Sequence, residues 1–406
     1  MKRCVVAALL LLMSCAREEP APEPARPGHG KVPADLVVEQ NNLLDITRGA
    51  TLVSRTGEAA LPVSTINVID GNADTFWTPP AHDYPQSMVI ALGAPARIDR
   101  VGFRSITFGG FQAEHVIFER SLDGAAWQPL VTMTAQRIDE AQWANVAPAD
   151  AGYLRVTVPD TKTPGRDVRL ETLFARGTEI GERHESPLDG CWSMNGISAT
   201  FAQKGTSATG VVAQRVPVFL AGGTDGRMWR FNWIRGNDYG YTALTVAPDG
   251  KHLSALNWHE EAIPLFVALP WFGERAPCDA IKPRDDVLIA VLRRAGHVSM
   301  FALRFDAGGR LLADSSREEL QSLANIMRTA PRPLRIVAHE FRQSDAKRNK
   351  DFAAAEIASL RQALVTLGAD VAHAEWVAAG SDAPRQKPES TAARAIYSSV
   401  EVEVRR

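Results

Sequence analysis

Residues 37–178 contain short strand-like runs of apolar residues, and one of them, 153–158, alternates at a period of two. The clearest runs are 87–92, ended by Gly93, then 116–119 and 153–158, with turn residues between them. No stretch of this region has the apolar spacing of a helix. Short strand-like runs that are separated by turns predict an all-β sandwich.

Residues 183–281 also contain strand-like runs, at 228–233, 241–246 and 252–258. The turn signals Asp225-Gly226 and Asp249-Gly250 separate these runs. A small β-meander or barrel is expected. Its tryptophans either fill the core, as large aromatics usually do in a small barrel, or line a ligand cavity. His259-Glu260-Glu261 follows the last run and is expected to be a solvated strand end. The tryptophans are Trp192, Trp229, Trp233, Trp258 and Trp271.

Residues 284–406 mix both periodicities. Strands are predicted at 298–305, 334–339 and 398–404. A helix over 316–329, with Ser315 as its N-cap, has apolar residues at helical spacing, and a second helix over 352–367 ends at Gly368. This order indicates a two-layer α/β domain.

The N-terminus has two basic residues followed by the apolar stretch 5–13. That stretch is too short to span a bilayer and fits a signal peptide. Leu12-Met13-Ser14-Cys15 resembles the lipobox of bacterial lipoproteins, which implies a signal peptide over 1–14 and lipidation of Cys15. The alternative is an ordinary signal peptide. Residues 15–36 are rich in Pro, Ala and Glu and predict an extended tether.

The lipobox resemblance places the chain in the cell envelope, held to a membrane by lipid. Ala16 follows the cysteine, and in the family a residue other than Asp there favours the outer membrane, facing the periplasm. The formal net charge of −2 and the pI near 6.5 give no reason to expect a nucleic-acid partner.

The remaining cysteines predict a disulfide. Cys4 lies in the signal peptide and Cys15 is assigned to lipid, which leaves Cys191 and Cys278. In an oxidising compartment a single leftover pair is most simply bonded, and closing an 87-residue separation would contribute on the order of 4–5 kcal/mol in the chain-entropy model. Two unpaired buried thiols are the alternative.

The segment Asp70-Gly71-Asn72-Ala73-Asp74-Thr75-Phe76-Trp77 resembles the turn motif of discoidin domains, the coagulation factor V/VIII C-type family. Later pieces follow in the family's order, including Ser121-x-Asp123-Gly124-x-x-Trp127 and Tyr153-Leu154-Arg155-Val156. The resemblance implies a jelly-roll module that binds glycans or, in some members, lipid or protein surfaces.

The discoidin resemblance also implies a structural Ca²⁺ beside the turn, held by Asp70, Asn72, Thr75 and, on the last strand, Glu171. These are the hard oxygen ligands that calcium prefers. The alternative is that Asp70 only caps its own turn. Candidate glycan contacts lie on two loops, at His82 and Tyr84 and at Phe108 and Phe111, although both phenylalanines could be core residues.

Residues 284–406 resemble the OmpA C-terminal family, which binds peptidoglycan. Phe305-Asp306 matches the opening strand of that family, and His339 matches the histidine of its Gly-His-Thr-Asp strand end. The family's ligand-binding Asp and Arg fall on Phe341 and Glu356, so its charge-matched recognition is expected to be lost. The degenerate peptidoglycan-binding candidates that remain are His339, Arg342, Asp345 and Arg394.

No catalytic motif stands out. His339-Glu340 lacks the second histidine of a zinc-protease HExxH motif, and the chain contains neither GxSxG nor a P-loop. The sequence therefore predicts a non-catalytic, lipid-anchored envelope protein that binds a glycan or another envelope component, such as an envelope protein. The alternatives are a structural tether to peptidoglycan and a cryptic hydrolase in the middle domain.

Overall fold

The computed structural model describes residues 41–57, 63–79, 83–106, 110–182, 187–260, 269–278, 281–330, 333–341, 345–382 and 390–405. The predicted signal peptide, the predicted lipidation site Cys15 and the predicted tether lie outside these ranges. Among the described residues, no helix is both long and apolar enough to cross a membrane.

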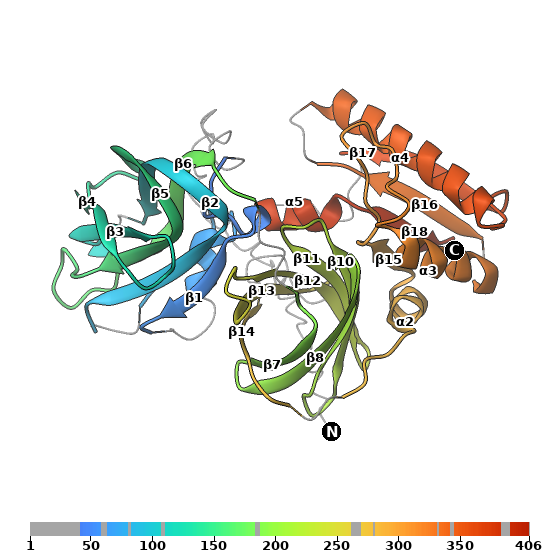
Figure 1. Ribbon diagram of the computed structural model, residues 1–406, viewed down its shortest axis with the longest axis horizontal. Helices are drawn as coiled ribbons and strands as arrows, with labels where there is room; N and C mark the ends of the chain where they lie inside the picture. Colours follow the sequence, from blue (N-terminus) through green and yellow to red (C-terminus); the bar gives the residue numbers. More distant parts are fainter. Residues whose placement is uncertain are drawn as a thin grey trace, which may run out of the picture. The chain divides into compact units, whose positions relative to one another are not determined.

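The first region is a β-sandwich built on two long strands, β2 and β5 (Figure 1). The strands are hydrogen-bonded in the order β1-β2-β5-β3-β4, and β6 pairs with the other edge of β2. Alternate side chains, such as Phe103, Phe118 and Leu154, are fully buried, so the predicted sandwich is confirmed. The elements are η2 Ile46–Arg48, β1 Thr51–Arg55, η3 Thr65–Ile69, β2 Gln86–Ser105, β3 His115–Ser121, β4 Gln128–Thr134, β5 Gln142–Val158 and β6 Leu170–Glu179.

The expected strand end at Gly93 is wrong, because β2 continues through it to Ser105. A glycine is required at position 93 because the backbone of Arg48 lies close to it, and not because the chain turns there. A β-carbon at this position would lie 2.1 Å from the carbonyl oxygen of Arg48. The glycine therefore lets η2 lie directly against β2.

The second region is a closed barrel of eight antiparallel strands (Figure 1). An eight-stranded barrel is just wide enough to be filled by side chains, and the apolar cluster here includes Phe201 and Phe231. Trp192, Trp229 and Trp233 belong to the same cluster, so these three are core residues, whereas Trp258 and Trp271 are half-buried. The strands are β7 Gly190–Met194, β8 Ile197–Lys204, β9 Ser207–Val212, β10 Val218–Thr224, β11 Trp229–Arg235, β12 Asp238–Val246, β13 His252–His259 and β14 Leu269–Arg275.

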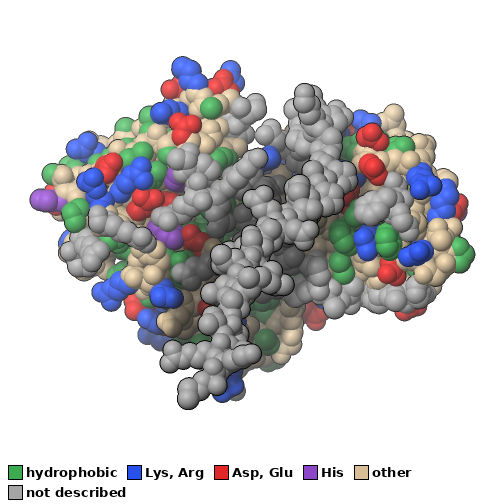
Figure 2. All heavy atoms as spheres, turned by 180° about the vertical axis from the view of Figure 1, so that it is seen from behind, with side chains coloured by type: hydrophobic (Ala, Val, Ile, Leu, Met, Phe, Trp, Pro, Cys, Tyr) green, Lys and Arg blue, Asp and Glu red, His purple; other side chains and the backbone are tan. Residues whose placement is uncertain are grey.

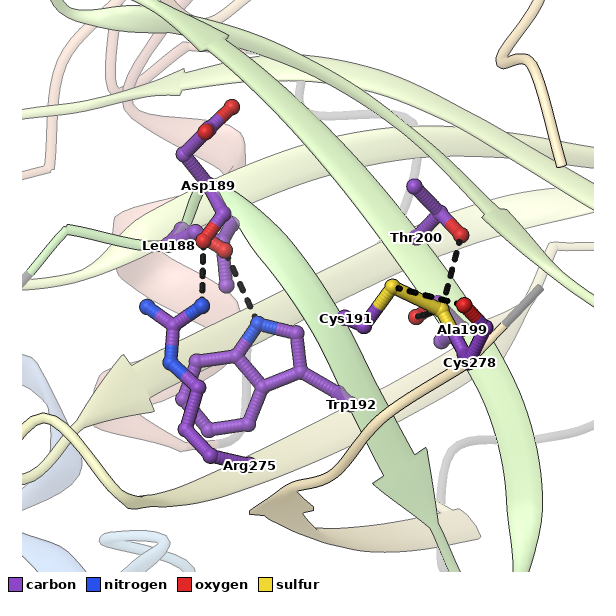
Figure 3. The surroundings of a disulfide bond; sticks show 8 residues. All are labelled: Leu188, Asp189, Cys191, Trp192, Ala199, Thr200, Arg275 and Cys278. Carbon is purple, nitrogen blue, oxygen red and sulfur yellow. Dashed lines mark hydrogen bonds between the residues drawn. A yellow bond between two sulfur atoms is a disulfide. The ribbon is translucent and has the colours of Figure 1, made fainter. Parts of the chain in front are cut away.

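Cys191 and Cys278 form the predicted disulfide, with their Cα atoms 5.7 Å apart. It joins β7 to the segment that follows β14 (Figure 3). Beside it, the indole of Trp192 donates to the carbonyl of Leu188 at 2.8 Å, and the guanidinium of Arg275 lies 4.1 Å from the centre of the Trp192 ring. The first barrel strand is thus covalently tied where the barrel closes.

The third region has a four-stranded sheet in the order β15-β18-β16-β17, in which only β16 and β17 are parallel. Helix α4 packs on β16 and β17 (Figure 1). The elements are α2 Val287–Ala295, β15 His297–Met300, α3 Arg317–Thr329, β16 Leu334–His339, α4 Ala346–Thr366, β17 Ala374–Gly380, α5 Thr391–Tyr397 and β18 Val400–Val404.

Several boundaries in this region differ from the sequence predictions. The strand expected over 298–305 ends at Met300. Helix α3 follows Ser316, whose hydroxyl accepts from the Arg304 backbone N–H and does not cap the helix. Helix α4 begins six residues earlier than expected because Asp345 caps it, and the last strand begins at Val400. The sequence analysis did not predict α2, β17 or α5.

Both faces of the barrel wall are buried at β11. Trp229, Phe231 and Trp233 point into the barrel core, while Ile234 packs in the apolar cluster of the third region. Asn232, also on the outer face, bonds the backbone of Ser299 in edge strand β15: its amide donates to the Ser299 carbonyl at 2.7 Å, and its oxygen accepts from the Ser299 N–H at 3.1 Å.

The barrel covers edge strand β1 of the sandwich in the same way. The hydroxyl of Ser254 accepts from the Leu52 N–H at 2.9 Å and donates to the Leu52 carbonyl at 3.2 Å. Thr245 donates to the carbonyl of Ala50 at 2.9 Å. The residues from Glu39 to Arg406 consequently form a single compact unit.

We predict that Asn232→Ala lowers the free energy of unfolding by roughly 2–4 kcal/mol, because it leaves two backbone groups of Ser299 buried without their partner. Urea unfolding followed by circular dichroism measures the loss. Asn237→Ala, at an exposed asparagine beyond the end of the same strand, is the matched control and should change little. Equal effects of the two substitutions would contradict this role for Asn232.

Candidate functional site

The Asp-Gly-Asn turn is closed by its own hydrogen bonds. The two carboxylate oxygens of Asp70 accept from the Asn72 N–H and from the Thr75 hydroxyl, each at 2.8 Å. All three side chains are buried. Trp77, at the end of the motif, exchanges backbone hydrogen bonds with Leu170 of β6. The turn is therefore fixed against the start of β6, and Asp70 does cap it.

Glu171 follows Leu170 and is buried on the same strand. Its carboxylate lies 2.9 Å from Nε of Arg104. Burial raises the pKa of Glu171 to about 7, against the opposing effect of Arg104, and nearby Asp139 and Asp74 raise it further. The carboxyl is thus balanced between its neutral and charged forms near neutral pH.

The predicted calcium ligands lie on two segments that pair through Trp77 and Leu170. Their chemistry suits calcium, since two carboxylates, a hydroxyl and a carbonyl are all oxygen donors. However, a guanidinium already neutralises Glu171, and no cluster of three or more acidic, His or Cys side chains suited to a metal occurs among the described residues. Calcium stays a prediction.

Two candidate glycan contacts fall within the described residues. Tyr84 is half-buried, and its hydroxyl accepts from the Val168 N–H at 3.0 Å. Burial raises the Tyr84 pKa to about 12. Phe111 is also half-buried, and its carbonyl accepts from the Arg169 N–H at 3.1 Å. His82 and Phe108 lie outside the described residues.

Arg169 links Phe111 to a further aromatic ring, that of Phe76. Its guanidinium carbon lies 3.7 Å from the ring centre of Phe111 and 4.9 Å from that of Phe76, so the cation stacks with both rings. Burial lowers the pKa of Arg169, and the charge of Asp167 opposes this shift. Arg166 lies farther out, 5.8 Å from the Phe111 ring, and is exposed.

Asp167 completes the cluster, because its Oδ1 is buried without a hydrogen-bond partner in the described part of the chain. Arg166, Asp167 and Arg169 were not among the contacts predicted from the sequence. The signal was present: residues 159–169 form a long polar connection between two strands, and long connections in compact domains are often functional. We call Phe76, Tyr84, Phe111, Arg166, Asp167 and Arg169 the loop cluster.

The degenerate peptidoglycan-binding candidates have separate roles. His339 is buried, with Nε2 3.6 Å from the carboxylate of Glu401. Asp345 caps α4 by accepting from two backbone N–H groups. Arg394 lines a cavity, and Arg342 lies outside the described residues. Phe341 and Glu356, which the sequence resemblance aligned with the ligand-binding residues of the OmpA C-terminal family, line that same cavity.

Glu260 is not the solvated strand end that the sequence suggested. Its carboxylate lies 2.7 Å from Nε2 of His297, and both side chains are nearly buried. The prediction was wrong because the end of β13 is covered by the strand that begins at His297. Glu261 lies outside the described residues.

Surface charge is mixed. On the face drawn in Figure 2, basic and acidic side chains of the described residues lie interspersed, in line with a formal net charge of −2.

The comparisons with known proteins agree on the first region. Residues 53–172 match the F5/8 type C domain family. This stretch is a discoidin-like domain. The match confirms the sequence-based resemblance there; it does not reach the barrel or the third region. No curated protein sequence matches the chain.

Solved structures similar to the chain cover about a third of it. The C-terminal domain of a chitobiase from Bacteroides fragilis is 24% identical, with a TM-score of 0.31, over 33% of this chain and 97% of that domain. A family 32 carbohydrate-binding module from a family 31 glycoside hydrolase of Clostridium perfringens is 17% identical, with a TM-score of 0.31, over 35% and 98%. The family 32 module of Clostridium perfringens NanJ, in complex with galactose, is 17% identical, with a TM-score of 0.27, over 31% and 98%.

We predict that Arg104→Ala destabilises the protein more at pH 8.5 than at pH 5.5. The pKa of Glu171 near 7 leaves its carboxyl mostly neutral at the lower pH and mostly charged at the higher one. At pH 8.5 the loss should be roughly 2–4 kcal/mol, as for a buried ion pair that loses one partner, and it should shrink at pH 5.5. Urea unfolding at the two pH values measures this.

Arg97→Ala is the control for this prediction. Arg97 lies on the same strand and pairs with Asp150 on the exposed surface, where an ion pair contributes little. Its effect should be small and equal at both pH values. A cost of Arg104→Ala that does not change with pH would show that Glu171 is not the group that depends on Arg104.

Proposed function

We propose that the protein is a non-catalytic, lipid-anchored envelope protein that binds a glycan through the loop cluster of its discoidin-like domain. The arrangement of Phe76, Arg169 and Phe111 is the observation that carries this proposal. A guanidinium stacked with two half-buried rings is already held in place, so little conformational entropy is lost when a ligand binds.

The loop cluster has the chemistry that a sugar needs. Half-buried aromatic rings offer apolar surface to the C–H face of a pyranose. Arg166 and Arg169 can donate hydrogen bonds to hydroxyl oxygens, and the half-buried carboxylate of Asp167 can accept them. A few well-placed polar groups beside apolar surface are typical of small-ligand sites.

The remaining assignments rest on the sequence. Lipid on Cys15 would hold the protein in the envelope, on the outer membrane facing the periplasm, and residues 15–36 would set its reach. An OmpA-like third region would then serve as a module for contacts with the cell wall or with envelope proteins. The geometry gives less support to a peptidoglycan tether, since His339 and Asp345 are engaged within the fold. It gives less support to a hydrolase in the barrel, whose interior is filled.

We predict that the full chain binds members of a glycan array and that Arg169→Ala weakens binding of the best ligand at least tenfold in calorimetry. Phe111→Ala should do the same by removing the ring under the guanidinium. Trp143→Ala is the matched control: this half-buried ring also lies under arginines, Arg100 and Arg176, but on the sheet. Binding that both loop variants retain, or no binding to any glycan, would refute the proposal.

We also propose that the turn at Asp70 can hold Ca²⁺, with Asp70, Thr75, Asn72 and Glu171 as its oxygen ligands. A bound cation would stabilise the folded protein, since the unfolded chain lacks the site. We expect millimolar calcium to raise the melting temperature by a few degrees relative to chelator, and Asp70→Asn to abolish this rise. Asp123→Asn, in another turn closed by an aspartate, should preserve it. A rise that persists in Asp70→Asn would place calcium elsewhere.

A further inference from the structure

A cavity of about 640 Å³ is lined by residues of all three regions. Its wall includes η2, the hairpin between β10 and β11, the segment after β15, and helices α4 and α5. This volume suits a small-molecule ligand. Among the described residues, the charged lining is strongly unequal, with five basic residues against the acidic Asp225 and Glu356. The basic residues are Arg48, Arg227, Arg230, Arg304 and Arg394.

Two of the arginines are oriented by backbone carbonyls. Nη1 of Arg230 donates to the carbonyls of Ala395 and Ser398, both at 3.0 Å. Nη1 of Arg304 donates to the carbonyl of Thr224 at 3.0 Å. Carbonyl oxygens orient a guanidinium, and the one that Arg304 contacts carries no negative charge to neutralise it. These contacts therefore keep positive charge at fixed positions in the wall.

The other three arginines differ in how far a neighbouring carboxylate neutralises their charge. Arg48 pairs with Glu179, yet its Nε is buried with no acceptor within the described ranges. The guanidinium groups of Arg227 and Arg394 have neither a hydrogen-bond nor an ion-pair partner within those ranges. Arg227 is exposed on the hairpin and Arg394 is half-buried on α5. Both are available to a ligand.

We infer that this cavity binds a small ligand with two or more negatively charged groups, either carboxylates or phosphates. Guanidinium groups bind both kinds of anion through paired N–H donors. Several arginines on different walls favour a ligand with separated charges over one with a single charge. The cavity shares no residue with the loop cluster, so anion binding in the cavity can be tested independently of glycan binding at the loop cluster.

The test is calorimetric titration of the full chain, at about 50 mM salt, with inorganic pyrophosphate, with citrate and with neutral galactose as separate probes. We expect one-to-one binding of pyrophosphate or citrate that weakens as salt is raised. Binding of pyrophosphate alone would assign phosphate groups to the ligand, and binding of citrate alone would assign carboxylates. Arg394→Ala should weaken binding at least tenfold, and Arg227→Ala several-fold.

Arg310→Ala is the control, because Arg310 is exposed in the same region and pairs with Asp306 away from the cavity lining. It should leave binding unchanged. Arg227 has no described side-chain partner, so its replacement should leave the fold intact, and the melting temperature without ligand checks this. The inference is overturned if neither anion binds, or if Arg394→Ala and Arg227→Ala both bind as tightly as the unaltered chain.

Discussion

The organisation of this protein depends on polar side chains on the outer face of the barrel that hydrogen-bond the edge strands of the two neighbouring sheets. An edge strand presents unpaired N–H and C=O groups, which are costly to bury. The side chain of Asn232 hydrogen-bonds both the N–H and the C=O of Ser299 in β15, and the hydroxyl of Ser254 hydrogen-bonds both the N–H and the C=O of Leu52 in β1. Because the partners are buried and paired, the apolar surface around them can be continuous: one cluster contains Leu52 of the sandwich, Tyr241 and Leu256 of the barrel, and Ile396 of α5.

This organisation separates two kinds of site. The loop cluster belongs to the sandwich alone and lies on loops, one of which leads into β6, where Arg169 holds Phe76 and Phe111 together. The arginine-lined cavity exists only because the three regions pack together, since each contributes part of its wall. Substitutions that loosen the packing should therefore disturb the cavity and spare the loop cluster.

Local sequence pattern predicted three of the sandwich strands (β2, β3 and β5) and three of the barrel strands (β11, β12 and β13), because short apolar runs between turn residues are encoded locally. The disulfide was predicted because only two cysteines remained to pair. Local pattern failed where the deciding partner is distant in the sequence. Gly93 was predicted to end a strand, but it is a glycine because the Arg48 carbonyl lies against it. Glu260 was predicted to be solvated, but it pairs with His297 and is nearly buried. Only part of the loop cluster could be predicted. Tyr84 and Phe111 were candidates because they are aromatic residues on loops. Arg169 and Asp167 could not be recognised, because their place in the cluster depends on how the 159–169 connection packs against Phe111.

The central claim is that the barrel binds the sandwich and the third region into one cooperative unit. Scanning calorimetry of the full chain tests it most directly. The account predicts a single transition whose calorimetric and van't Hoff enthalpies agree, and which shifts as a whole when a glycan binds to the sandwich. Two separable transitions, with a glycan shifting only one of them, would show that the sandwich folds independently and would contradict the account.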